Sequence, residues 1–201
     1  MSADGALRPR ILRAGDGPVS TWSAPNLICI GRILLVPVFV AVFLAAPDDV
    51  VQRWWATALF VVTIATDSVD GHLARSRNLV TDLGKILDPI ADKAITGAAL
   101  VVLSVVGEVP VWVTALILLR EIGITAYRFA VLSKRVIPAS KGGKLKTVLQ
   151  SVAIGLALAP LPALLGGWMA GVNAAVVTAA LVVTVVTGVQ YLIDDHRLNA
   201  R

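Results

Sequence analysis

Four aspartates stand out in an otherwise apolar sequence because their spacing would let them act together. Asp67 and Asp70 form an i,i+3 pair, and Asp88 and Asp92 form an i,i+4 pair. Residues three or four apart are neighbours on a helix surface, so each pair would lie on one helix face. Carboxylates are the ligands that Mg²⁺ and Mn²⁺ prefer. The spacing therefore indicates a metal site, where cations would offset the repulsion among the four charges.

The two pairs would also come level with each other in a helical hairpin. Asn78 and Thr81 are suitable ends of two successive helices, because Asn favours a helix C-terminus and Thr an N-cap. Measured from these residues, the inner acids lie roughly 11–12 Å and the outer acids roughly 16–17 Å along their helices. Two divalent ions held at these depths could bridge a diphosphate and position a nucleophile.

Small residues beside the acids would leave room for a large ligand. Gly71 and Ala74 follow Asp70 with almost no side chain, and Arg75 is placed to contact a phosphate. A carboxylate that is not fully used as a metal ligand could deprotonate an attacking hydroxyl. The alternative is structural, with the acids paired to Lys and Arg to hold a bundle together. The glycine beside four level carboxylates favours the ligand site.

The composition predicts an all-α integral membrane protein. Of the 201 residues, 57% are hydrophobic and 15% are charged, and the mean hydropathy is +0.81. Soluble domains have about 25% charged residues. The single cysteine, Cys29, excludes an intrachain disulfide. The net charge of +5 is not accompanied by interleaved aromatic residues, so no nucleic-acid partner is expected.

The apolar segments predict six transmembrane helices, at residues 27–46, 54–75, 86–106, 110–132, 147–166 and 171–193. They form a catalytic membrane domain over residues 25–194. Residues 1–24 would be a cytoplasmic segment, either an interfacial helix or a tail, and residues 195–201 a cytoplasmic tail. Residues 194–197 are expected at the surface. The first apolar segment is long enough to span a bilayer and more spans follow it, which favours a retained span over a signal peptide.

Turns and basic residues predict the orientation. Gly107-Glu108 and Gly166-Gly167 mark turns on one side of the membrane, where Arg53 is the only basic residue and Trp54 and Trp55 would lie at the interface. The basic residues of the other side are Arg8, Arg10, Arg13, Arg77, Lys85, Lys134, Arg135, Lys141, Lys144, Lys146, Arg197 and Arg201. The positive-inside rule therefore predicts that both termini and the acidic hairpin are cytoplasmic.

Further polar residues interrupt the predicted spans. Arg32 lies within the first span, where it would either extend to the headgroups or face the bundle interior. Arg120 and Glu121 lie near the middle of the fourth span. Residues 140–150 combine lysines with two glycines before a helix start. These features would suit an anion such as phosphate, although a solvated basic loop gives the same pattern.

The acidic stretch resembles the signature of the CDP-alcohol phosphatidyltransferases, in residue type and in spacing. The matching residues are Asp67, Asp70, Gly71, Ala74, Arg75, Gly84, Asp88 and Asp92. The resemblance implies a six-span fold, usually a homodimer, with a site for two Mg²⁺ or Mn²⁺ ions that opens to the cytoplasm. It implies that the four aspartates bind the metals and that Asp92 is also the general base. It further implies a CDP site formed by Asp67, Asp70, Gly71, Ala74, Arg75 and Gly84.

Residues 26–37, Arg120-Glu121 and residues 140–150 resemble the branch of that family whose acceptor is sn-glycerol 3-phosphate, apart from Cys29, where that branch commonly has threonine. This resemblance implies transfer of a phosphatidyl group from CDP-diacylglycerol to the 1-hydroxyl of the acceptor, with release of CMP. The candidates for binding the acceptor phosphate are Arg120, Arg128, Lys141, Lys144 and Lys146. Inositol phosphate is the alternative acceptor. An ion transporter, or a purely structural membrane subunit, is the alternative from another class.

Overall fold

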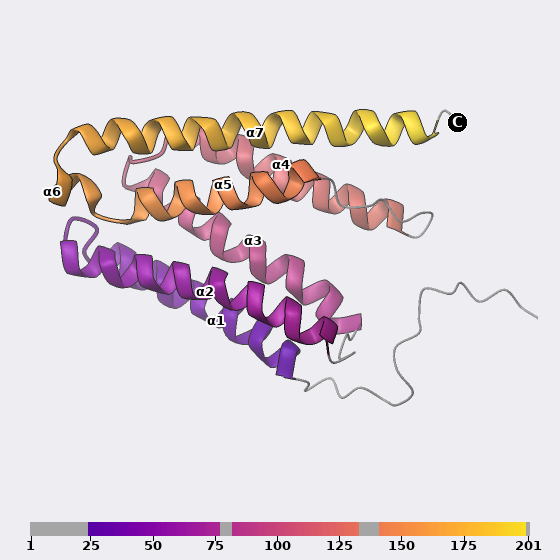
Figure 1. The fold of residues 1–201 in the computed structure, drawn as a ribbon. Helices are drawn as coiled ribbons and strands as arrows, with labels where there is room; N and C mark the ends of the chain where they lie inside the picture. The colour runs from indigo at the N-terminus through magenta and orange to yellow at the C-terminus, as the bar shows by residue number, and fades with distance from the viewer. Residues whose placement is uncertain (1–23, 77–81, 133–140, 200–201) are drawn as a thin grey trace, which may run out of the picture.

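The structure is a computed structural model, and it describes residues 24–76, 82–132 and 141–199 (Figure 1). These residues form six long helices and one short one, and no strand. The predicted apolar segments are confirmed as helical over most of their length. The helices are α1 (Ala24–Ala45), α2 (Val50–Ser76), α3 (Asp82–Val105), α4 (Val111–Leu132), α5 (Lys141–Leu158), α6 (Leu161–Leu165) and α7 (Trp168–Asn199).

The predicted turns hold, but one predicted span does not. Gly107 (φ +82°) and Gly166 (φ +98°) adopt left-handed backbone conformations, which suit glycine. The span predicted at residues 147–166 is not one continuous helix. It begins earlier, at Lys141, and it breaks after Leu158, because Pro160 cannot donate the backbone bond that would continue the helix.

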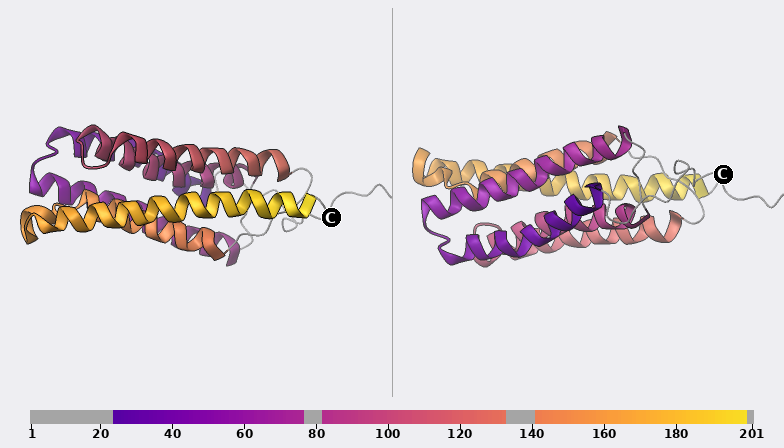
Figure 2. Two further views of the ribbon diagram at one scale, coloured as in Figure 1. Left: turned by 90° about the horizontal axis from the view of Figure 1, so that it is seen from above. Right: turned by 90° about the horizontal axis from the view of Figure 1, so that it is seen from below.

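The long helices lie roughly side by side in an elongated bundle (Figures 1 and 2). Helix α3 packs against α1, α2, α4 and α5, whereas α7 packs against α4 and α5. The beginnings of α1, α3 and α5 and the ends of α2, α4 and α7 all lie at one end of the bundle, which we call the acid-bearing end (Figure 1). The short connections before α2, α4 and α7 lie at the opposite end. The predicted alternation of the helices is therefore confirmed.

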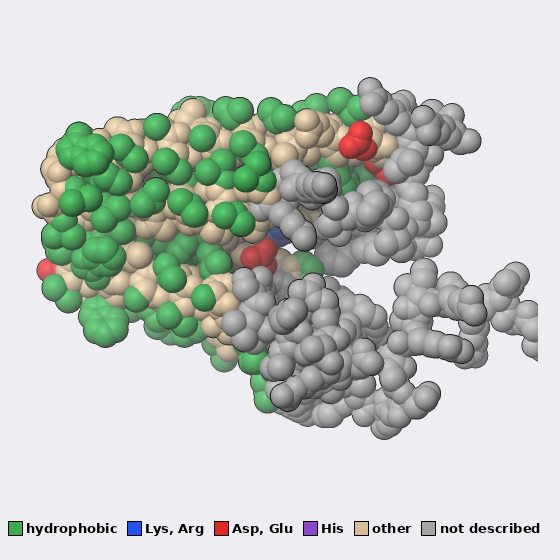
Figure 3. All heavy atoms as spheres, viewed as in Figure 1, with side chains coloured by type: hydrophobic (Ala, Val, Ile, Leu, Met, Phe, Trp, Pro, Cys, Tyr) green, Lys and Arg blue, Asp and Glu red, His purple; other side chains and the backbone are tan. Residues whose placement is uncertain are grey.

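The outside of the bundle is apolar. Large hydrophobic side chains are exposed along the helices, for example Leu34 (64%), Val105 (68%) and Leu119 (71%). Figure 3 shows such side chains over much of the described surface. By length and composition, two helices of the described residues could cross a membrane, Asn26–Ala45 and Trp168–Asp195. The placement of all six long helices in a membrane stays a prediction.

The core changes in character along the bundle. Towards the opposite end it is aromatic and aliphatic, with the Phe39 ring 6.3 Å from the rings of both Phe43 and Phe60. Towards the acid-bearing end the buried residues include the polar Asn26, Arg32 and Lys146, which are 1–5% exposed. Buried polar groups need partners, which neighbouring helices must supply in this half of the bundle.

Arg53 joins several elements at the opposite end. Its guanidinium forms an ion pair with Glu108 and donates to the carbonyls of Ala157 (2.6 Å) and Leu158 (3.0 Å), the last two residues of α5. It also lies 5.8 Å above the centre of the Phe43 ring. The last carbonyls of a helix have no partner within it, so Arg53 completes the C-terminus of α5.

The C-terminal part of the chain differs from its prediction. Helix α7 continues to Asn199, through the boundary predicted after residue 194. Asp195 was expected at the surface, and this is wrong: it is 2% exposed and accepts a hydrogen bond from the Tyr127 hydroxyl. The Tyr191 ring packs edge-on against Tyr127, at 6.4 Å between ring centres. Sequence hydropathy could not show that α4 would supply this partner.

Candidate active site

The four signature aspartates lie on two antiparallel helices that are in contact. Asp67 and Asp70 are on the last turns of α2, and Asp88 and Asp92 are on the first turns of α3. Both helices reach the acid-bearing end (Figure 1). The predicted helix ends, Asn78 and Thr81, lie outside the described residues, as do the side chains of Asp67, Asp70 and Asp88.

The depths of the aspartates can be compared from the helix bounds. Asp70 is six residues before Ser76 and Asp88 is six residues after Asp82, so both lie about 9 Å from a helix end. Asp67 and Asp92 are nine and ten residues from these ends, or about 13–15 Å. The backbone thus keeps the pairing of inner and outer acids that the sequence predicts.

The predicted CDP-binding residues share these helices. Gly71, Ala74 and Arg75 follow Asp70 on α2, and Gly84 lies in the first turn of α3. The structure describes the backbone of these residues but not their side chains. These positions put the small residues on the same two helices as the acids and at the same end of the bundle.

A buried ionic cluster connects α3, α4 and α5 beside this hairpin. Glu121 is 7% exposed and lies on α4. Its carboxylate accepts hydrogen bonds from Lys93 of α3 (2.9 Å), from Arg120 (3.0 Å) and from Lys146 of α5. Lys146 is 5% exposed, and Lys93 follows Asp92 directly in the sequence. We call these four residues the Glu121 cluster; three cations share one carboxylate in it.

Arg120 also ties the Glu121 cluster to α7. Its Nε donates to the Thr184 carbonyl (3.2 Å) and its Nη2 to the Thr187 hydroxyl (3.3 Å). Gly188 makes this approach possible, because a Cβ there would lie 3.1 Å from the Cγ of Arg120. The orientation of Arg120 therefore depends on the absence of a side chain on α7.

The structure brings together only some of the predicted acceptor residues. Arg120 and Lys146 meet at Glu121, as described above. Arg128 lies on α4, and Lys141 and Lys144 lie in the first turn of α5, but their side chains are outside the described ones. Lys93 was not among the predicted residues. The sequence did contain a signal for Lys93: it is a charged residue in an apolar helix, directly after Asp92.

A groove of about 450 Å³ opens between α3 and α4 beside the Glu121 cluster. Apolar side chains form most of its wall, while Lys93 and Glu121 contribute charge and Gln150 of α5 lies among the lining residues. Gln150 is 5% exposed, and its Oε1 accepts no hydrogen bond in the described part of the chain. The complete lining consists of Pro89, Ile90, Lys93, Ala94, Thr96, Leu118, Glu121, Ile122, Thr125, Ala126 and Gln150.

Comparison with known proteins identifies the family of this chain. Residues 22–189 match the CDP-alcohol phosphatidyltransferase family, which covers both the acidic hairpin and the Glu121 cluster. The chain belongs to this family. Membership confirms the resemblance noted in the sequence and makes the chain a transferase, and nothing supports the ion-transporter alternative.

Individual relatives point to one branch of the CDP-alcohol phosphatidyltransferases. The chain is 45% identical over 168 residues to a probable phosphatidylglycerophosphate synthase of Mycobacterium tuberculosis strain H37Rv, covering 83% of this chain and 78% of the relative. It is 37% identical over 144 residues to the CDP-diacylglycerol–glycerol-3-phosphate 3-phosphatidyltransferase of Bacillus subtilis, covering 66% and 75%. A Rickettsia typhi protein of the same name is 39% identical over 136 residues, covering 66% and 74%.

Proposed function

We propose that this chain transfers the phosphatidyl group of CDP-diacylglycerol to sn-glycerol 3-phosphate, giving phosphatidylglycerophosphate and CMP. The relatives described above are named for this reaction. The observation that carries the proposal is the Glu121 cluster, which has an excess of two positive charges beside the acidic hairpin. A phosphorylated acceptor would complement that excess, whereas a neutral alcohol would not.

The acids fit a pair of divalent metal ions. Oxygen ligands from four carboxylates at two matched depths suit Mg²⁺ or Mn²⁺, and Asp67, Asp70, Asp88 and Asp92 would hold them. When bound, the ions would neutralise negative charge that develops on the departing phosphate.

The remaining steps fall to the side chains of this chain. Asp92 takes the proton of the 1-hydroxyl, whose oxygen then bonds to the β-phosphorus of the CDP-lipid. The bond from that phosphorus to the bridging oxygen breaks, and CMP leaves. Gly71, Ala74 and Gly84 leave space for the CDP group, and Arg75 contacts its phosphates. Asp67 and Asp70 also border that site.

The acceptor phosphate binds among the cations of the Glu121 cluster. Lys93, Arg120 and Lys146 lie around Glu121, so a phosphate would join a cluster that already has positive charge in excess. Arg128, Lys141 and Lys144 belong to the same two helices, α4 and α5, and add charge towards the acid-bearing end.

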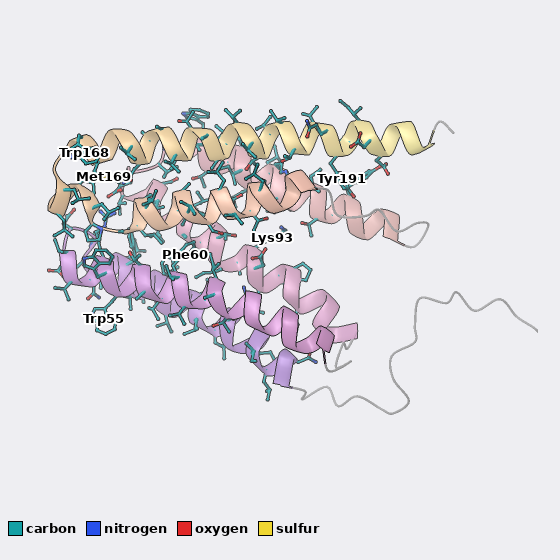
Figure 4. All side chains as sticks on the ribbon, viewed as in Figure 1. Trp55, Phe60, Lys93, Trp168, Met169 and Tyr191 are labelled. Atoms are coloured by element: carbon teal, nitrogen blue, oxygen red, sulfur yellow. The ribbon has the colours of Figure 1, made fainter. Side chains whose placement is uncertain are left out.

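We place the six long helices across a membrane, with the acid-bearing end in the cytoplasm. The apolar exterior supports this placement, as do four exposed tryptophans near the helix starts at the opposite end (Figure 4 labels Trp55 and Trp168). Tryptophan is enriched at membrane interfaces. The four are Trp54, Trp55, Trp112 and Trp168. As in the family resemblance, the protein is proposed to be a homodimer.

The test is CMP release from CDP-diacylglycerol by the purified full chain, with a panel of acceptors and with or without EDTA. We expect release with sn-glycerol 3-phosphate and Mg²⁺ or Mn²⁺, and none in EDTA. Consumption of inositol phosphate while glycerol 3-phosphate is ignored would replace the proposed acceptor. CMP release that persists unchanged in EDTA would remove the metal site from the proposal.

A further inference from the structure

Arg32 is a buried cation that the proposed reaction has not used. It is 3% exposed, so its guanidinium lies inside the bundle and does not extend to the headgroups. Cys29, one turn earlier, is also 3% exposed, and Phe39 and Phe43 are fully buried further along α1. These residues share the face of α1 that is turned towards the rest of the bundle, and α1 packs against α2 and α3.

Counted along the helices, Arg32 lies at a depth similar to that of Asp92. It is 13 residues before Ala45, the last residue of α1, and Asp92 is 13 residues before Val105, the last residue of α3. Both helices run from the acid-bearing end towards the opposite end (Figure 1). On α2, which runs the other way, Asp67 lies about one turn closer to the acid-bearing end than the residue level with Arg32.

The distribution of acids limits what can complement this charge. A guanidinium buried among helices is costly unless an anion accompanies it. Helix α1 has no acidic residue, and every acid of α2 and α3 is near the acid-bearing end. Apart from Asp82, at the start of α3, these are the four signature aspartates.

We propose that Arg32 is a positioning residue of the carboxylate site, acting on its outer pair, Asp67 and Asp92. Its positive charge offsets part of the repulsion among the four acids and holds the carboxylate of Asp92 for proton transfer. A third helix, α1, thus contributes to a site that the signature assigns to α2 and α3 alone. Metal ions, when bound, would share the neutralisation of the acids with Arg32.

A double-mutant cycle in EDTA tests this coupling without metal or substrate. Apparent Tm values are measured for the purified full chain with R32M, D92N and D67N, singly and combined. We expect R32M to lower the Tm by about 4 °C or more, and D92N or D67N to restore at least half of that loss, because removing an acid relieves the repulsion. D48N, an exposed acid in the α1–α2 turn, is the matched control and should add nothing.

Additive effects of R32M with both acids would overturn the proposal. If R32M alone does not accumulate, the accumulation of R32M/D92N decides in the same way: rescue supports the coupling and its absence overturns it. In the activity assay, R32M should lower kcat at least about tenfold with little change in KM, R32K should recover part of it, and C29A on the same face should behave as wild type. Wild-type kcat in R32M would also overturn the proposal.

This inference rests on the proposed reaction for its catalytic meaning, but the two can fail separately. A wild-type chain that releases no CMP with any acceptor would contradict the proposed function. The cycle in EDTA would still measure whether Arg32 and the aspartates are coupled.

Discussion

Replacing Glu121 by Gln should destabilise the protein strongly, because it leaves three cations without the carboxylate they share. Glu121 and Lys146 are 7% and 5% exposed, so water cannot take over the lost interaction. Removing one partner of a buried ion pair costs about 3–5 kcal/mol. For a chain of this size, that corresponds to a Tm lower by roughly 6–20 °C.

The matched control makes the same chemical change in a more accessible pair. Glu108 pairs with Arg53 at the opposite end, and its side chain is 29% exposed. After E108Q, water reaches the open side of this pair, and the Arg53 guanidinium, 12% exposed, keeps its bonds to the carbonyls of Ala157 and Leu158. E108Q should therefore lower the Tm clearly less than E121Q does. The double variant E121Q/K146M should recover part of the E121Q loss, since it removes the most buried of the stranded cations.

Thermal unfolding of the purified variants in detergent, followed by circular dichroism, measures these differences. If E121Q and E108Q lower the Tm equally, the burial argument for the Glu121 cluster is wrong. If E121Q/K146M is less stable than E121Q, Lys146 is held by something other than Glu121.

Three further predictions concern single side chains. G188A would place a Cβ 3.1 Å from the Cγ of Arg120 and so displace that guanidinium. We expect the KM for glycerol 3-phosphate to rise roughly fivefold, which corresponds to about 1 kcal/mol. The control G171A, which has open space around it, should leave the KM unchanged. D92N should lower kcat by about 10²–10⁴-fold in the CMP-release assay, and retained activity would exclude Asp92 as the base. R53M should lower the free energy of unfolding by about 2–4 kcal/mol, because the variant loses the charged hydrogen bonds from Arg53 to α5. Thermal unfolding measures this loss. A large change in the KM for glycerol 3-phosphate would contradict a purely structural role of Arg53.

Local features of the chain were well predicted from the sequence. The i,i+3 and i,i+4 spacing of the aspartates, with helix ends expected at Asn78 and Thr81, predicted two depths for the acids, and the observed bounds of α2 and α3 give the same two depths. Gly107 and Gly166 were recognised as turns because few other residues adopt a positive φ. Both features depend on residues that are close together in the sequence, so a short stretch of sequence is enough to predict them.

Interactions between helices were not predictable in the same way. Lys146 was predicted just before the fifth span, as one of the candidates for binding the acceptor phosphate. In the structure it is buried within α5, where it pairs with Glu121, 25 residues earlier. Asp195 was assigned to the surface, yet Tyr127, 68 residues earlier, covers it. A charged residue in a chain of this composition can face headgroups, solvent or the interior, and hydropathy does not separate the three.

The helical architecture, the acidic hairpin and the family could be predicted without a structure, because helix periodicity and motif spacing are local properties. Three features could be seen only once the helices were packed together: the cations that gather at Glu121, the contact of Arg120 with Gly188 of α7, and the burial of Arg32 inside the bundle. These outcomes depend on how the helices are rotated and placed against one another. That arrangement follows from packing over the whole bundle, in which each side chain's partner comes from a distant part of the chain.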